Sequence, residues 1–172
     1  MGTKIMDIGF NAFEVFEIAE KIERNGVSFY RKAAELFDEP QVRKMFLELV
    51  NWEAKHIEVF TDMRKQLSGQ SQELKTFKPE NNMVIDAQAM AGLAVFGIKP
   101  DPSDELTGSE TVVDVLKKAI EKEKDSIVYY VGLKDFVSTR AGKHKIDDII
   151  SEEMRHIRIL GQSLEQRREL QA

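Results

Sequence analysis

The chain repeats one short pattern at two places, Trp-Glu-Ala-Lys-His at residues 52–56 and Glu-Glu-Met-Arg-His at residues 152–156. Residues three apart lie on the same face of a helix, so each segment presents a carboxylate and an imidazole together. These pairs are Glu53 with His56 and Glu153 with His156. The third histidine, His144, has no glutamate three residues before it and lacks the pattern.

An offset of 100 residues carries further features of the first half onto the second. The matching pairs include Ala19 with Ala119, Glu23 with Glu123, Tyr30 with Tyr130, Phe46 with Ile146, and Leu49 with Ile149. Apolar positions map onto apolar positions, and an additional glutamate accompanies each Glu-x-x-His pair. A fixed offset of this kind predicts two copies of one structural unit.

Apolar residues recur at steps of three and four along four stretches, which predicts helices over residues 11–38, 40–68, 110–138 and 142–169. The short breaks between the first two and between the last two make each pair antiparallel. Residues 69–109 form the expected long crossover, with a short helix in the apolar piece at 83–96. The pattern predicts an all-α, ferritin-like four-helix bundle of two hairpins joined by that crossover.

Length and composition agree with a single helical domain over residues 1–172. The sequence is 42% hydrophobic and 32% charged, with only 10 glycines and 4 prolines, which argues against disorder and against a many-stranded protein. A net charge of -5 argues against a nucleic-acid partner.

The sequence has no cysteine, so it forms no disulfide, iron-sulfur cluster or rubredoxin-type iron site. Any metal must be held by oxygen and imidazole. The longest uncharged apolar stretch, residues 90–98, is far too short to cross a membrane, and residues 1–10 have no signal-peptide core. We therefore expect a soluble, cytoplasmic protein.

The inward glutamates and histidines point to a metal centre. A single Glu-x-x-His pair usually marks a solvated helix face, but both copies here interrupt apolar stripes. Four buried carboxylates repel one another, and two divalent cations would neutralise them while two neutral imidazoles complete the ligand set. This chemistry favours iron or manganese and tolerates zinc. The expected metal ligands are Glu23, Glu53, His56, Glu123, Glu153 and His156.

The repeat selects among neighbouring glutamates. Glu23 pairs with Glu123, whereas Glu20 pairs with Ile120, so Glu20 is kept as an extra or alternate carboxylate. Tyr30 and Tyr130 lie two turns beyond the ligand glutamates, and their phenols could either bond to the ligands or simply pack in the core.

At these residues the chain resembles the rubrerythrin branch of the ferritin-like di-iron proteins. The resemblance covers the first ligand helix at residues 19–30, its counterpart at 123–130 and both Glu-x-x-His segments. It implies two iron ions and reduction of hydrogen peroxide with electrons from a rubredoxin domain. Without cysteines, this chain needs an external donor such as a rubredoxin. The family's additional carboxylate has no match, because Ser126 lies one turn beyond Glu123.

The expected function is therefore that of a di-iron oxidoreductase that uses peroxide or, second to it, dioxygen. Two alternatives remain at the level of sequence: ferritin-like oxidation and handling of ferrous iron, and a helical module without catalysis. We also expect a homodimer, because ferritin-like hairpins often pair.

Overall fold

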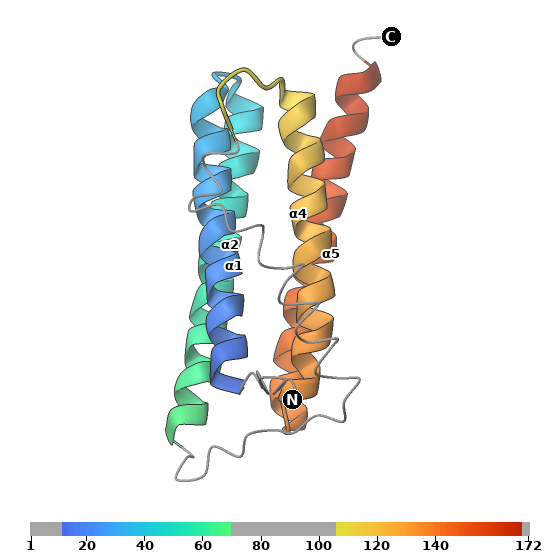
Figure 1. Ribbon diagram of the computed structural model, residues 1–172. Helices are drawn as coiled ribbons and strands as arrows, with labels where there is room; N and C mark the ends of the chain where they lie inside the picture. The colour runs from blue at the N-terminus through green and yellow to red at the C-terminus, as the bar shows by residue number, and fades with distance from the viewer. Residues whose placement is uncertain (1–11, 70–105, 170–172) are drawn as a thin grey trace, which may run out of the picture.

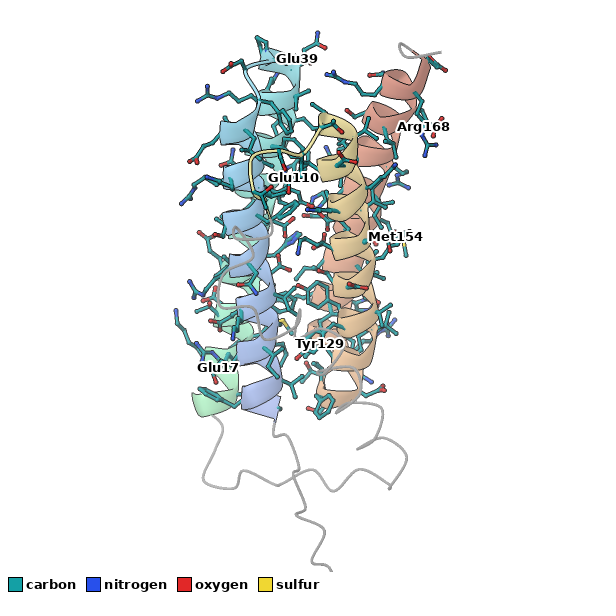
Figure 2. All side chains as sticks on the ribbon, turned by 45° about the horizontal axis from the view of Figure 1, so that its top comes forward. Glu17, Glu39, Glu110, Tyr129, Met154 and Arg168 are labelled. Atoms are coloured by element: carbon teal, nitrogen blue, oxygen red, sulfur yellow. The ribbon has the colours of Figure 1, made fainter. Side chains whose placement is uncertain are left out.

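The computed structural model describes residues 12–69 and 106–169, which form a bundle of helices without strands (Figure 1). Its elements are α1 (Ala12–Leu36), α2 (Pro40–Gly69), α4 (Val112–Leu133), the short 3-10 helix η2 (Lys134–Phe136) and α5 (Arg140–Glu169). The all-α prediction is thereby confirmed. The expected crossover helix at 83–96 lies outside the described residues. None of the described helices has the length and apolar character that a membrane span requires.

The helices pack as two antiparallel hairpins, α1 with α2 and α4 with α5 (Figure 1). In that view α1 and α5 run upward, whereas α2 and α4 run downward. The chain thus leaves α2 and enters α4 at opposite ends of the bundle. This up-down-down-up order is the topology expected from the short hairpin connections and the long segment between them.

Local signals in the sequence account for the helix starts in the second hairpin. The Thr111 hydroxyl accepts from the Asp114 N–H at 3.2 Å, and the Asp114 carboxylate accepts from the Thr111 N–H at 3.0 Å, a capping box that begins α4. At the start of α5, the Thr139 hydroxyl accepts a single capping hydrogen bond from the Gly142 N–H at 3.1 Å.

The corner between α4 and α5 differs from the prediction. The third helix was expected to reach residue 138, but α4 ends at Leu133, η2 follows, and α5 already begins at Arg140. Val137 leaves the helical conformation, with φ -106° and ψ 117°, and buries its side chain in the apolar core. This non-local contact, together with the cap from Thr139, sets the boundaries.

Two apolar clusters fill the bundle, and the offset of 100 exchanges them. One contains Val15, Phe16 and Ala19, and the other contains Val115, Leu116 and Ala119. Similarly, Tyr30 packs in one cluster and Tyr130 in the other. The two hairpins are thus related by an approximate twofold axis, so equivalent residues from both halves can meet between the clusters.

Candidate metal centre

The six residues selected from the sequence are all buried, and each of the four helices contributes to the set. Glu23 comes from α1, Glu53 and His56 from α2, Glu123 from α4, and Glu153 and His156 from α5. The steps of three within α2 and α5 turn each carboxylate and imidazole toward the interior. A charged layer therefore crosses the bundle between apolar residues of both halves.

The ligand atoms form two overlapping groups. One consists of Glu23, Glu53, His56 and Glu153, and the other of Glu53, Glu123, Glu153 and His156; within each, the ligand atoms lie within 4.8 Å of one another. Glu53 and Glu153 belong to both groups. Each group therefore has one histidine and one glutamate of its own, and the two groups share a pair of carboxylates.

Several atoms in this layer face one another without forming hydrogen bonds. His56 Nδ1 and Glu153 Oε1 lie 2.9 Å apart, yet neither has a hydrogen-bond partner among the described residues, and Glu53 Oε1 also lacks one there. Buried polar atoms are normally paired, and leaving them unpaired is costly. Atoms that converge in this way, with oxygen and imidazole donors only, fit a shared metal ion better than they fit each other.

Each tyrosine holds a glutamate from the other hairpin. The Tyr30 hydroxyl donates to Glu123 Oε1, and the Tyr130 hydroxyl donates to Glu23 Oε1. Both phenols are buried, and burial raises the pKa of each well above its usual value, so both remain donors. The tyrosines therefore tie α1 to α4 and orient two carboxylates of the layer.

The electrostatics of the cluster favour protons when no cation is bound. Burial raises the pKa of Glu23 and Glu123, and the charges of Glu53 and Glu153 raise it further. Burial acts in the opposite direction on His156, but hydrogen bonds to carboxylates prevail and raise its pKa to about 12. Protons thus occupy positions that cations would take, and metal binding would displace them.

The histidines have the reverse effect on the two shared carboxylates. Burial alone would raise the pKa of Glu53 and Glu153, but the proton-bearing groups that face them, both histidines among them, hold it below its usual value. The shared carboxylates are therefore the anionic centre of the layer.

Other candidate residues lie outside the two groups. Glu20 is buried, but its Oε1 pairs with Arg64 Nε at 2.7 Å, so an ion pair already neutralises it. Glu121 is exposed and pairs with Lys124, and His144 is exposed on α5. The structure therefore brings together the six residues that the repeat singled out and leaves these three apart.

A small cavity, which the sequence pattern did not predict, adjoins the carboxylates. Its volume is about 20 Å³, and its lining includes Glu23, Glu53 and Glu123 together with Gly26 and Ser126. A Cβ at Gly26 would lie 3.3 Å from the Glu53 side chain, so the glycine keeps this space open. The available signal was that positions 26 and 126, related by the offset, both hold small residues.

Comparisons with known proteins agree with this architecture. Residues 14–91 match the family model Rubrerythrin. A crystal structure from Thermotoga maritima, assigned to the ferritin-like diiron-carboxylate proteins, is 26% identical and superposes with a TM-score of 0.67, covering 91% of this chain and 96% of that chain. No curated protein matches the sequence significantly.

Fold and site together define a ferritin-like four-helix bundle with a carboxylate and histidine centre. Within that class, the chain is similar to the Rubrerythrin family over residues 14–91 and to the Thermotoga maritima protein over most of its length.

Proposed function

We propose that the chain is a non-haem di-iron oxidoreductase that reduces hydrogen peroxide with electrons from an external donor. The observation that carries the proposal is the doubled set of one histidine, one glutamate and two shared carboxylates, with unpaired atoms facing inward. Two bound iron ions would supply two electrons by passing from the ferrous to the ferric state. Hydrogen peroxide takes up these two electrons and two protons and leaves as two molecules of water.

The chain's own residues would prepare the site for a small oxidant. Tyr30 and Tyr130 fix the carboxylates of Glu123 and Glu23, so these groups need not reorganise during the reaction. The cavity beside Gly26 has a volume of about 20 Å³, which suits a small oxidant such as peroxide or dioxygen better than an organic substrate. The apolar clusters on both sides restrict access of bulk water to the centre.

An external reductant belongs to the proposal because the sequence has no cysteine with which to hold a rubredoxin-type iron. A separate small rubredoxin is the donor that we would test first. The homodimer expected from the sequence is part of the same proposal, and sedimentation of the iron-loaded protein would measure it.

The proposal can be tested by loading the protein with ferrous iron without oxygen. We expect saturation near two ions per chain, oxidation by about one equivalent of peroxide, and further turnover only after reduced rubredoxin is added. His156→Ala should lower the iron content, whereas His144→Ala, which removes the exposed histidine of the same helix, should not. Manganese and zinc loading would establish the metal preference.

Stopped-flow mixing of the reduced protein with each oxidant separates the alternatives. Faster reaction with dioxygen, together with uptake of far more than two ions per chain, would favour iron oxidation and handling. Failure to bind any metal would instead leave a helical module without catalysis.

A further inference from the structure

The approximate symmetry of the site breaks at positions 52 and 152. These positions are equivalent by the offset of 100, and each lies one residue before a shared carboxylate. Each also contacts the histidine of the opposite hairpin. Because the two residues are tryptophan and glutamate, the contacts differ in kind.

Glu152 supplies a carboxylate to His56. Its Oε2 lies 2.9 Å from His56 Nε2, and its side chain is 50% exposed. A carboxylate accepts, so Nε2 carries the hydrogen, and in the neutral ring Nδ1 is left with its lone pair. Nδ1 is the atom that faces Glu153 and Glu23, at 2.9 and 3.5 Å. Such an acceptor fixes the tautomer of a metal-binding histidine and makes it a stronger ligand.

Trp52 supplies an aromatic ring to His156. Its indole stacks on the imidazole, with centroids 4.9 Å apart and planes inclined by 13°. The Arg155 guanidinium lies over the same indole, 4.9 Å from the ring centroid. An indole has no acceptor oxygen, so Trp52 cannot accept a hydrogen bond from an imidazole N–H as Glu152 does. Among the described residues, His156 therefore has no counterpart of the carboxylate that strengthens His56.

We propose that the two metal positions are inequivalent, with the position served by His56 binding a divalent cation more tightly, and that Glu152 is the positioning residue responsible. The inference rests on the proposed metal centre and adds an order of filling to it. The difference has a direct physical source, because the six ligands are matched between the halves and the contacts behind the histidines are not.

The test is an anaerobic titration of the metal-free protein with Co²⁺, in which calorimetry and visible absorption measure the binding. We expect two binding steps that differ in affinity by roughly 10–100-fold, the effect usual for partners behind a metal ligand. His56→Ala should remove the tighter step, and His156→Ala should remove the weaker one.

Variants of Glu152 assign the cause. Glu152→Ala should weaken the tighter step by roughly 10–100-fold and leave the weaker step in place. Glu152→Gln keeps an acceptor oxygen without its charge and should restore part of the loss. Glu165→Ala removes another exposed glutamate of α5 and should change neither step. All three should keep the melting temperature of the metal-free protein, because water can reach the half-exposed position 152 and accept from His56 Nε2 there, and Glu165 is exposed.

The possible results are distinct. Two equal affinities in the parent protein, or an unchanged tighter step in Glu152→Ala, would overturn the inference and leave the metal centre standing. A fall in the melting temperature of metal-free Glu152→Ala that matches its loss of affinity would reduce the residue to a structural role and also overturn it. No Co²⁺ or iron bound by the parent protein would remove the proposed function itself.

Discussion

Glu20 and Glu23 show how one turn of helix separates two roles for the same residue type. Both are buried on α1, yet Glu20 is neutralised by Arg64, whereas Glu23 accepts from Tyr130 and faces His56. The ion pair leaves Glu20 with its charge already compensated. Glu23 retains a carboxylate that a cation can bind, because its neighbours in the layer are other ligands.

At the residue scale, we predict that Glu23→Ala removes at least one equivalent of bound iron, because one metal group loses its own glutamate. Glu121→Ala, which alters an exposed residue of α4, should leave iron binding unchanged. Anaerobic titration with ferrous iron measures both. Loss of iron in Glu20→Ala with normal binding in Glu23→Ala would show that the repeat selected the wrong residue of α1.

Among the elements, α5 contains two glycines in opposite surroundings. A Cβ at Gly142 would lie 2.6 Å from Val137 Cγ1 and 2.9 Å from Thr139 Oγ1, whereas a Cβ at Gly161 would meet no atom of the described residues within 4 Å. The first glycine lets the chain turn tightly from η2 into α5, and the second only weakens the helix.

We predict opposite effects of alanine at these two positions. Gly142→Ala should destabilise the metal-free protein by about 1–3 kcal/mol, because the methyl group overlaps the buried Val137 and the cap. Gly161→Ala should stabilise it by up to about 1 kcal/mol through higher helix propensity. Urea unfolding of both variants measures the change in the free energy of unfolding. A change of the same sign in both would contradict the role given to Gly142 in the turn from η2 into α5.

For the whole molecule, the central layer links folding to metal binding. In the metal-free protein the pKa values of Glu23 and Glu123 are raised above the ordinary value of 4.5. Their contribution to folding stability is therefore complete below pH 4.5, and it is lost as the pH rises through the pKa values of the folded state. The contribution of His156 is likewise complete below pH 6.5, and it is lost as the pH rises toward the folded-state pKa of about 12. Glu53 and Glu153 act oppositely, and their contribution is lost as pH falls below 4.5.

We therefore predict that the melting temperature of the metal-free protein falls between about pH 5 and pH 9, because over this range the native state binds more protons than the unfolded chain does. Bound metal should raise the melting temperature, and the increment should grow over the same range because protons compete less. Differential scanning calorimetry of both forms measures these trends. A metal increment that is largest at the acidic end would refute the proton-for-cation exchange.

The regular features of this protein could be predicted from its sequence because they depend on local periodicity. Steps of three and four place apolar residues on one helical face, and the same rule puts Glu53 beside His56. The offset of 100 added long-range information, since two copies of one hairpin can bury their polar positions only against each other. This offset predicted Glu23 and Glu123 as metal ligands and gave Glu20 no matching glutamate.

Features that depend on contacts between hairpins required the tertiary structure. No periodicity links Tyr30 to Glu123, or Glu152 to His56, because each pair joins helices distant in the chain. The cavity beside Gly26 exists only because a side chain of α2 passes that glycine, and the end of α4 depends on where Val137 finds apolar neighbours. The face of a helix on which a residue lies follows from local backbone geometry. The residues that contact the buried glutamates and histidines from the other hairpin depend instead on how the two hairpins pack.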